Sequence, residues 1–477
     1  MLLSKLLCGA GSNFSDIEVS GVTCNSKEVK EGYAFVCISG IGADGHDFAE
    51  DAVKRGAAVV IAERDLGLDN QVIVKSTRKV FASMCAAWFG FPAKKLRLIG
   101  VTGTNGKTSV TYMLKAILEK AGFKVGLIGT IHNLIGDTPV ETKNTTPGAY
   151  ELNSLFSRMV DAGCQWCVME VSSHALDQYR VYDIPFAAAA FTNLTQDHLD
   201  YHKTMENYLA AKKKLFGMCD IAVINTDDPY SAELMRGLDC KTVTYSNGNS
   251  ATYSARSVRY KPDSVEYEML WGGKLDHIKV SIGGDFTVYN SLLAASVAVE
   301  VGIDIATVKA ALAQMQGVKG RAESVPTGRD FSVIIDYAHT PDGLKNILQT
   351  FAKCEKNRLV LVFGCGGDRD KTKRPIMGSI AVHSADYVIV TSDNPRTEDP
   401  RAIIDDILEG TKNCGTPVKV IENRVEAIKY AVKTARPGDI IVLAGKGHET
   451  YQILKDKTIH LDEREVINEA LNEIKGE

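Results

Sequence analysis

Short apolar runs recur along the chain, separated by glycine-rich turns and by segments whose apolar residues fall at helical spacing. This alternation predicts an α/β protein. Residues 1–96 combine the runs YAFVCI, AAVVIA and NQVIVK with turns such as SGIGADGHDF, which predicts a small α/β domain. The pattern then restarts twice further along the chain. We therefore expect three domains, at residues 1–96, 97–326 and 327–477.

The second segment opens with a strand, a glycine loop and a long helix. The strand LRLIGV leads into TGTNGKT, and apolar residues follow at helical spacing from Val110 to Leu118. The further runs KVGLIGT, WCVMEVS and IAVINT continue the same pattern. Residues 254–282 predict a local antiparallel insertion, followed by a helix at about 288–301. This order indicates a phosphate-loop ATPase-like, mostly parallel sheet.

The third segment contains four apolar strands, each followed by a polar loop that carries glycine or proline. These units are FSVIIDYAHTPD, RLVLVFGCGGDRD, ADYVIVTSDNPR and GDIIVLAGKGHE, with helical segments between them. They predict a Rossmann-like, doubly wound, mostly parallel sheet. Ligands of such sheets bind outside the carboxyl ends of the strands. All four loops are therefore candidate parts of one site.

Composition and charge narrow the function classes. The length of 477 residues agrees with three domains of about 150 residues each. Lys and Arg total 55 against 59 acidic residues, so the net charge is −4. The chain thus has no excess of positive charge for sequence-independent binding of nucleic acid. Apolar runs long enough to span a bilayer are absent. The eleven cysteines are odd in number and scattered along the chain, which suits reduced thiols better than a disulfide framework. We therefore expect a cytoplasmic protein.

The strongest local signal for chemistry is the loop between the first strand and the helix of the second segment. Small residues let backbone N–H groups and the helix N-terminus surround a polyphosphate. Lys107 would neutralise the terminal phosphate, and the Thr108 hydroxyl would bind magnesium. The spacing departs from GxxxxGK[ST], because Val101 stands where the first glycine is usual. The predicted nucleotide-binding residues of this loop are Gly103, Thr104, Asn105, Gly106, Lys107 and Thr108.

A carboxylate and a polar cluster follow in the same segment. Glu170 ends a buried strand, where a second magnesium ligand is expected, although an acid that caps the next helix is the alternative. Downstream, FTNLTQDHLDYH contains His198, and Lys212 lies in YLAAKKKLF. Magnesium prefers oxygen ligands, so histidine and lysine would be unusual choices. Taken alone, this cluster resembles a solvated loop and a basic helical face.

Ten motifs together resemble one known family. TGTNGKT, TTP, EVSSHAL, TNLTQDHLDYH, YLAAK, GRAE, DYAHTPD, GCGGDRDKTKRP, SDNPRTEDP and GKGHE occur in the order and spacing of the Mur ligases. The resemblance covers essentially the whole chain. It implies ATP-dependent amide formation in peptidoglycan precursor synthesis, with ATP and two magnesium ions. A UDP-N-acetylmuramoyl dipeptide and an amino acid would be the substrates of an enzyme that we expect to be a monomer.

The resemblance assigns the catalytic and metal-binding residues. Lys107 and Thr108 match the lysine and the magnesium-binding hydroxyl of the family's phosphate loop. Glu170 matches a carboxylate that bridges two magnesium ions, and His198 matches a ligand of the second ion. Lys212 matches a lysine that the family carries as a carbamate. A carbamate would replace the ammonium with anionic oxygen, which explains a lysine near magnesium.

The resemblance also assigns residues that bind the substrates. Around the nucleotide it implies Asn290, Arg321, Asp336 and His339. For the UDP-muramoyl dipeptide it implies Ser26, His46, Asn144, Thr145, Thr146, Ser172, Gln178 and Arg180. For the incoming amino acid it implies Arg374, Asp393, Asn394, Arg396, Gly445 and Glu449. The chain departs from the family at Asn25 and Lys27, where Asp and Arg are usual, and at Thr287, where Asn is common.

The loop Asp393–Arg396 argues for meso-diaminopimelate as the amino acid, to be joined to the D-glutamate γ-carboxylate through an acyl phosphate. Only meso-diaminopimelate has a second amino-acid head, whose carboxylate suits the planar guanidinium of Arg396. Lysine would leave that arginine unpaired. The alternatives are a lysine-adding ligase and a folylpolyglutamate synthase-like ligase. From another class, a phosphate-loop regulator or a scaffold without turnover remains open.

Overall fold

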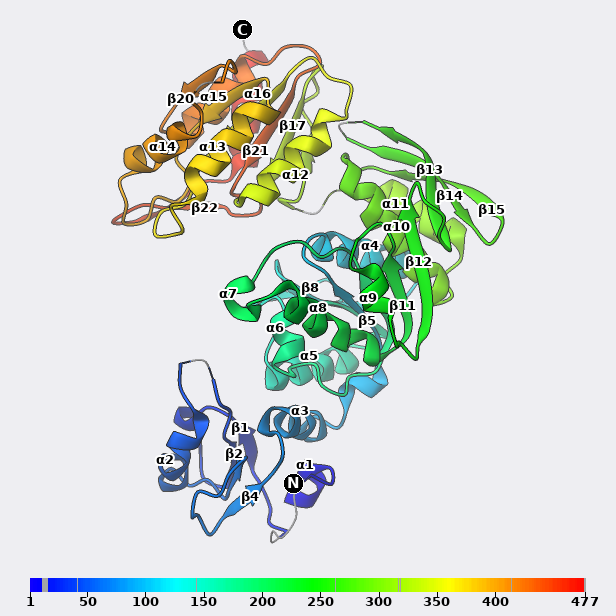
Figure 1. Ribbon diagram of the computed structural model, residues 1–477, viewed down its shortest axis with the longest axis vertical. Coiled ribbons are helices and arrows are strands. Elements are labelled where there is room, and N and C mark those ends of the chain that lie inside the picture. Colours follow the sequence, from blue (N-terminus) through cyan, green and yellow to red (C-terminus); the bar gives the residue numbers. More distant parts are fainter. Residues whose placement is uncertain are drawn as a thin grey trace. The chain divides into compact units, whose positions relative to one another are not determined.

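The computed structural model describes residues 1–10, 16–40, 42–142, 144–261, 263–315, 317, 319–412 and 414–475. The chain divides into two compact units. The first unit comprises Met1–Tyr245 with Leu293–Val308, and the second comprises Ser246–Leu292 with Lys309–Glu477. Figure 1 colours the chain along its sequence and labels many of its helices and strands.

The first unit begins with a four-stranded parallel sheet in the order β1-β2-β3-β4. Its strands are β1 Gly21–Thr23, β2 Tyr33–Val36, β3 Val59–Ala62 and β4 Gln71–Ile73. Its helices are α1 Leu3–Leu7, η1 Ser26–Glu28, η2 Gly45–Phe48, α2 Ala49–Lys54, α3 Thr77–Trp88 and η3 Pro92–Lys95. Alternate strand residues pack on α1 and α3 on one face and on α2 on the other. The predicted α/β fold of this segment is confirmed.

The same unit continues with strands in the order β12-β11-β10-β5-β9-β6-β7-β8. The six strands from β12 to β6 run parallel, and β7 and β8 are antiparallel. These strands are β5 Arg97–Thr102, β6 Val125–Ile128, β7 Asn133–Ile135, β8 Thr138–Val140, β9 Trp166–Glu170, β10 Phe186–Phe191, β11 Cys219–Asn225 and β12 Lys241–Asn247. A mostly parallel sheet with a phosphate loop is therefore confirmed.

Helices cover this parallel sheet. They are α4 Lys107–Lys120, α5 Ala149–Asp161, α6 Ser173–Asp177, α7 Leu199–His202, α8 Met205–Lys213, η4 Lys214–Gly217 and α9 Ser231–Met235. The helix α4 packs on β5, β6 and β9, with Val110, Leu114 and Ile117 fully buried. Because Gly106 adopts a left-handed φ of 85°, the chain turns directly from the loop into α4. The phosphate loop therefore connects a central strand to a rigid helix.

The second unit begins with the antiparallel strands β13 Tyr253–Tyr260, β14 Val265–Trp271 and β15 Lys274–Val280. This confirms the antiparallel insertion that the sequence predicts at residues 254–282. Two helices follow, α10 Asp285–Glu300 and α11 Ile305–Gln314, of which α10 begins three residues before its predicted start. The boundary between the two units falls within each of these helices.

The second unit also contains a six-stranded sheet in the order β16-β17-β21-β18-β19-β20, in which only β16 is antiparallel. These strands are β16 Glu323–Val325, β17 Ser332–Asp336, β18 Leu359–Phe363, β19 Tyr387–Val390, β20 Val418–Val420 and β21 Ile440–Ala444. A short hairpin follows, formed by β22 Tyr451–Ile453 and β23 Thr458–His460.

Helices cover both faces of the six-stranded sheet. They are α12 Pro341–Ala352, α13 Lys373–Ser384, α14 Pro400–Glu409, α15 Arg424–Lys433 and α16 Glu463–Lys475. One core joins alternate strand residues to α12, α13 and α14, and a second core joins the remaining strand residues to α15 and α16. Figure 1 shows this layering. The predicted doubly wound fold is confirmed, and its parallel strands bring four loops to one edge of the sheet.

No helix within the described ranges is long and apolar enough to cross a membrane. This agrees with the hydropathy of the sequence, which has a mean value of −0.07.

Candidate active site

The phosphate loop contacts the part of the chain that follows β10. The backbone N–H groups of Thr104 and Asn105 donate to the backbone and side-chain oxygens of Asn193, at 2.8 and 3.0 Å. Gly103 has a φ of 146°, and a Cβ there would lie 1.8 Å from Thr192 Oγ1. The position therefore requires glycine. The ammonium of Lys107 lies over the loop and donates to the carbonyls of Gly103 and Thr104, at 2.9 and 2.8 Å.

Glu170, at the end of β9, is buried beside the start of α4. Its Oε1 accepts hydrogen bonds from Thr108 Oγ1 and from the backbone N–H of Thr130, both at 2.9 Å. Its Oε2 accepts from Thr130 Oγ1 at 3.0 Å. The predicted pair of magnesium ligands, Thr108 and Glu170, therefore meets directly. Glu170 does not cap α6, which was the alternative role for this residue, because Ser172 caps that helix.

Lys212 lies on α8 and is 1% exposed. Its ammonium donates to the carbonyl of Gly103 at 2.8 Å and lies 4.4 Å from the ring centroid of Tyr208. Burial lowers the pKa of Lys212 well below that of an ordinary lysine, and the positive charge of Lys107 adds to this effect. Lys107 and Lys212 thus share Gly103 as a hydrogen-bond acceptor. A buried amine whose pKa is lowered lies against the phosphate loop.

His198 precedes α7 in a left-handed conformation with a φ of 54°. Its ring lies 4.8 Å from that of His174 and 6.3 Å from that of Tyr208. The Tyr208 hydroxyl in turn lies 3.2 Å from Thr104 Oγ1 on the phosphate loop. The ring of His198 is therefore connected to Lys212 and to the loop through Tyr208. The imidazole is half-exposed and pairs with Asp197 at 3.4 Å.

The donor set fits magnesium by its chemistry. Within the described ranges, no three His, Cys, Asp or Glu side chains gather closely enough to hold a metal ion. The predicted set contains only two residues of those types, Glu170 and His198, and its other members are the Thr108 hydroxyl and a modified Lys212. Oxygen from Thr108 and Glu170 is what magnesium prefers. Lys212 fits the same role only as a carbamate.

Several residues predicted for the muramoyl dipeptide gather beside Glu170. The Thr146 hydroxyl donates to the Glu170 carbonyl at 2.8 Å and accepts from the N–H of Ser172 at 3.0 Å. Arg180 donates to the Thr146 carbonyl at 2.9 Å and to Gln178 Oε1 at 2.7 Å. These four residues form one hydrogen-bonded group.

Thr145 joins this group to the carboxylate, because its hydroxyl lies 3.0 Å from Thr130 Oγ1. Asn144 is exposed, and its carbonyl accepts from Thr142 Oγ1 at 2.7 Å. The side chains predicted to hold the dipeptide thus begin at Glu170 and extend toward solvent.

Two predicted residues lie in the four-stranded domain. Ser26 begins η1 and is partly buried, and Asn25 caps η1 by accepting from the N–H of Lys27 at 3.1 Å. His46 is buried, with Nδ1 2.6 Å from Asp44 Oδ1, while Nε2 accepts from the N–H of Glu63 at 3.0 Å. Both ring nitrogens of His46 are therefore used within the domain. The His46 side chain has no exposed surface in this structure.

Three residues predicted around the nucleotide lie in the second unit near β16 and β17: Arg321 precedes β16, Asp336 ends β17, and His339 follows it. Asp336 accepts from the N–H groups of Ala322 and Ala338 at 2.7 and 2.8 Å, and burial raises its pKa. The Arg321 guanidinium lies 5.0 Å from the ring centroid of Tyr337.

His339 lies 2.9 Å, through Nδ1, from the Tyr337 carbonyl, and the ring of Tyr337 lies 4.7 Å from it. Asn290 is buried on α10, apart from these loops in the sequence. Arg321, Asp336 and His339 are thus arranged around Tyr337.

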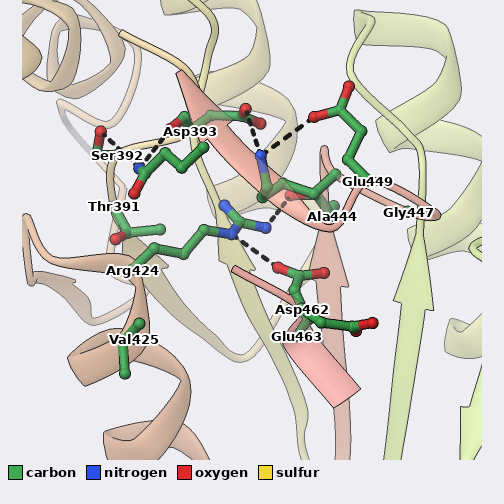
Figure 2. Close-up of polar contacts among 12 residues, drawn as sticks. Thr391, Ser392, Asp393, Arg424, Val425, Ala444, Gly447, Glu449, Asp462 and Glu463 are labelled. Atoms are coloured by element: carbon green, nitrogen blue, oxygen red, sulfur yellow. Dashed lines mark hydrogen bonds and ion pairs between the residues drawn. The ribbon is translucent and has the colours of Figure 1, made fainter. Parts of the chain in front are cut away.

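The residues predicted for the amino acid gather at the carboxyl ends of β19 and β21. Asn394 Nδ2 donates to Glu449 Oε2 at 2.9 Å. Gly445 has a φ of 118°, and a Cβ there would lie 2.5 Å from Asp393 Oδ2. Arg396 has a φ of 53°, and its guanidinium donates to the Gly367 carbonyl at 2.7 Å. Figure 2 shows Asp393 and Glu449 near the end of β21.

Arg374 is placed differently from the other predicted amino-acid ligands. It is 1% exposed on α13 and donates to both oxygens of Glu398, at 3.0 and 2.9 Å, and to Asp406 at 2.8 Å. The pairing lowers the pKa of Glu398 to about 2. Arg374 therefore ties α13 to the loop that follows Arg396 and to α14.

The sequence matches known proteins along most of its length. It matches the Mur ligase family catalytic domain at residues 18–86, the Mur ligase middle domain at 101–298 and the glutamate ligase domain of Mur ligases at 320–447. The UDP-N-acetylmuramoyl-L-alanyl-D-glutamate–2,6-diaminopimelate ligase of Clostridium botulinum is 47% identical over 465 residues, which is 96% of each chain. The chain belongs to the Mur ligase family.

Other Mur ligases extend this similarity to the structure. The enzyme of the same name from Caldanaerobacter subterraneus is 48% identical over 463 residues, again 96% of each chain. A solved structure of a ligase with this name is 32% identical, with a TM-score of 0.75, and the match covers 96% of this chain and 95% of that one. The Mur ligase architecture of three α/β domains therefore applies to this chain, while our domain boundaries and residue roles stay predictions.

Two features of this Mur ligase were missed by the sequence reasoning. Thr130 contacts both oxygens of Glu170, and the signal was its place two residues after β6, at the same sheet edge as the phosphate loop. Lys446 lies between the predicted ligands Gly445 and Glu449, and it is fully buried. A lysine inside a glycine-rich motif was the signal for it.

Proposed function

We propose that the chain is an ATP-dependent ligase that adds meso-diaminopimelate to the D-glutamate γ-carboxylate of UDP-N-acetylmuramoyl-L-alanyl-D-glutamate. ATP is converted to ADP and phosphate. The reaction provides a precursor of peptidoglycan. The observation that carries the proposal is the convergence of Lys107, Lys212, Thr108 and Glu170 on a phosphate loop in a chain that is 47% identical to a ligase of this name.

The residues of the phosphate loop suit phosphoryl transfer. A carboxylate is a poor electrophile and must first be activated. An oxygen of the D-glutamate γ-carboxylate attacks the γ-phosphorus of ATP. ADP leaves, and an acyl phosphate forms. Lys107 and the N-terminus of α4 neutralise negative charge on the phosphates. When bound to Thr108, Glu170, His198 and carbamylated Lys212, two magnesium ions would supply further charge neutralisation. No covalent bond to the protein is required.

Lys212 supports a carbamate in two ways. Its lowered pKa favours the neutral amine, which is the form that attacks CO2. The new N–C bond gives a carbamate anion, and one amine proton goes to solvent. The remaining N–H can still donate to the carbonyl of Gly103, which lies 2.8 Å from Nζ.

The second step is the attack of an uncharged amine of meso-diaminopimelate on the acyl carbon. The tetrahedral adduct expels phosphate, the amine proton is lost, and an amide bond remains. Exclusion of water favours this step, because water would hydrolyse the acyl phosphate. The nucleotide-side residues Arg321, Asp336 and His339 lie in the second unit and would contact ATP.

The amino-acid site favours meso-diaminopimelate over lysine. Arg396 presents a guanidinium for the carboxylate of the distal head, and Asp393 and Glu449 present acids for its ammonium. Lysine has a distal ammonium but no distal carboxylate, so Arg396 would remain desolvated and unpaired. Arg374, held by Glu398 and Asp406, would support this loop.

We further infer a cytoplasmic monomer. All eleven cysteines are free thiols, six of them buried, which suits a reducing compartment. The substrates are small molecules, and the net charge of −4 argues against a nucleic-acid partner.

The test is to incubate the protein with ATP, magnesium and the UDP-muramoyl dipeptide, and to offer meso-diaminopimelate, L-lysine or L-glutamate in parallel. We expect ADP formation and a product of the mass of the diaminopimelate adduct. Efficient addition of lysine instead would identify a lysine-adding ligase. Turnover without the UDP-muramoyl dipeptide would argue against the proposal as a whole.

A further inference from the structure

Lys446 is a buried cation at the centre of the predicted amino-acid site. It follows β21 and Gly445, and its side chain is fully buried. Its ammonium donates to Asn394 Oδ1 and to Glu449 Oε2, both at 3.1 Å, and lies 3.9 Å from Asp393 Oδ1. Lys446 therefore contacts three side chains that we assign to the amino acid.

Burial rules out a direct contact between Lys446 and a bound amino acid in this conformation. A buried ammonium is unfavourable unless nearby oxygens replace its hydration. Here those oxygens belong to Asn394, Glu449 and Asp393. Removal of the ammonium would take away the cation beside the Glu449 carboxylate. Glu449 would then be held by Asn394 Nδ2, at 2.9 Å, and Asn394 Oδ1 by the N–H of Ile453, also at 2.9 Å. Any influence of Lys446 on the substrate must pass through these neighbours.

A second buried ion pair fixes the backbone next to Lys446. Arg424 Nε donates to Glu463 Oε1 at 2.7 Å, and Arg424 Nη2 donates to the Ala444 carbonyl at 2.9 Å. Figure 2 shows this pair beside Ala444 at the end of β21. Both side chains are fully buried. Because Ala444 lies two residues before Lys446, the ion pair anchors the backbone that carries the lysine.

The charged side chains around Lys446 would be neutralised by one additional cation. Lys446 and Arg424 are positive, whereas Asp393, Glu449 and Glu463 are negative, so these five side chains carry a net charge of −1. Arg396 is not counted, because we assign it to the carboxylate of the ligand. Glu449 uses Oε2 for both Lys446 and Asn394. Its other oxygen, Oε1, makes no hydrogen bond to any residue that the structure describes. A ligand ammonium at this oxygen would neutralise the cluster.

We propose that Lys446 is a positioning residue that gives the site its selectivity for an amino acid with a second ammonium group. It holds Glu449 and Asn394 so that Glu449 Oε1 and Asp393 face that ammonium. This role rests on the proposed function, because it assumes that the amino acid binds at these loops. It goes beyond that function by assigning selectivity to a residue that does not touch the substrate.

The test compares Lys446→Met with the wild-type enzyme on two amino acids. One is meso-diaminopimelate, and the other is 2-aminopimelate, which keeps both carboxylates but lacks the second amine. We expect KM for meso-diaminopimelate to rise by about 30-fold or more, with KM for ATP changed by less than about twofold, because only the amino-acid side loses a held carboxylate. The preference for meso-diaminopimelate over 2-aminopimelate in kcat/KM should fall by about tenfold.

Lys446→Gln is the second variant, because glutamine keeps an N–H donor without the charge. It should keep more of the preference than Lys446→Met does. The matched control is Lys429→Met, which removes a lysine that pairs with Glu469 and Glu473, at 3.1 and 2.9 Å, elsewhere in the same domain. The control should change neither KM value.

The outcomes separate the inference from the proposed function. If wild-type enzyme does not add meso-diaminopimelate, the proposed function fails. If it does, and Lys446→Met keeps the wild-type preference, only the role of Lys446 fails. An equal loss of affinity for ATP and for the amino acid, or loss of folding in both Lys446 variants, would make Lys446 a general structural residue and would also overturn the inference.

Discussion

The ammonium nitrogen of Lys212 lies 2.8 Å from the carbonyl oxygen of Gly103, which places a buried lysine directly against the phosphate-binding loop. Lys107 donates to the same carbonyl, at 2.9 Å. Two cations at one acceptor repel each other. Burial and this repulsion together lower the pKa of Lys212, which is the property that the proposed carbamate requires of the amine.

Replacement of Lys212 by alanine should remove most of the activity. We expect kcat for ADP formation to fall by about 10²–10³-fold, as is common when a charged group at a reacting phosphate is lost. Short-chain carboxylates added to Lys212→Ala should restore part of the rate by supplying the missing oxygens. Lys213→Ala is the control, because the Lys213 ammonium contacts only the carbonyls of Glu233 and Arg236 among the described residues. A fully active Lys212→Ala would refute the role.

The stability of the protein should depend on pH through Lys212. The folded-state pKa of this lysine lies below its unfolded value of about 10.4. At a pH below the folded-state pKa, Lys212 is protonated in both states, so the buried charge lowers the free energy of unfolding by its full amount. Between the folded and unfolded pKa values, only the unfolded chain binds this proton. The free energy of unfolding therefore rises as the pH approaches about 10.

In buffer free of CO2 and magnesium, Lys212→Met should therefore be more stable than wild type at pH 7. The difference in the free energy of unfolding should shrink as the pH approaches 10. Denaturant unfolding at several pH values measures it. A difference that stays constant with pH would contradict the lowered pKa.

Thr130 should affect magnesium binding without contacting a substrate. Its hydroxyl donates to Glu170 Oε2 at 3.0 Å, so Thr130→Val would remove a hydrogen bond that orients this oxygen. Loss of such an outer contact typically costs about 10–100-fold in metal affinity or activity. Titration of activity with magnesium checks this. Thr138→Val, at an exposed position on β8, should behave as wild type; an unaltered magnesium dependence in Thr130→Val would remove Thr130 from the site.

Arg396 should act on the amino acid and not on ATP. Lysine at this position cannot form two parallel hydrogen bonds to a carboxylate. Arg396→Lys should therefore raise KM for meso-diaminopimelate by about 100-fold, while KM for ATP stays within about twofold. Arg401→Lys is the control, because Arg401 forms an exposed pair with Asp405 on α14. Unchanged kinetics for meso-diaminopimelate in Arg396→Lys would exclude Arg396 from amino-acid recognition.

The sequence predicted the fold well because apolar strands and the loops at their carboxyl ends are local features. The runs LRLIGV and GDIIVLAG appear as β5 and β21, and the loops after β17, β18, β19 and β21 do lie at one sheet edge. The antiparallel insertion was also visible, because alternating residues such as Tyr267 and Met269 point to one face.

The contacts that organise the site could not be predicted in the same way. Thr130 reaches Glu170 across 40 residues, and Arg424 reaches Glu463 across 39, so no local pattern indicates either pair. Arg374 matched the family as an amino-acid ligand, but its partners Glu398 and Asp406 become visible only when α13 packs on α14. His46 likewise matched the family, while its contact through Nε2 depends on Glu63, 17 residues away and directly after β3.

The central claim is that the D-glutamate γ-carboxylate accepts a phosphoryl group before the amine attacks. The most direct measurement uses UDP-muramoyl dipeptide labelled with ¹⁸O in both oxygens of that carboxylate, with ATP, magnesium and meso-diaminopimelate. We expect the released phosphate to carry one ¹⁸O atom per turnover and the new amide to carry the other. Product formation with unlabelled phosphate would contradict the account.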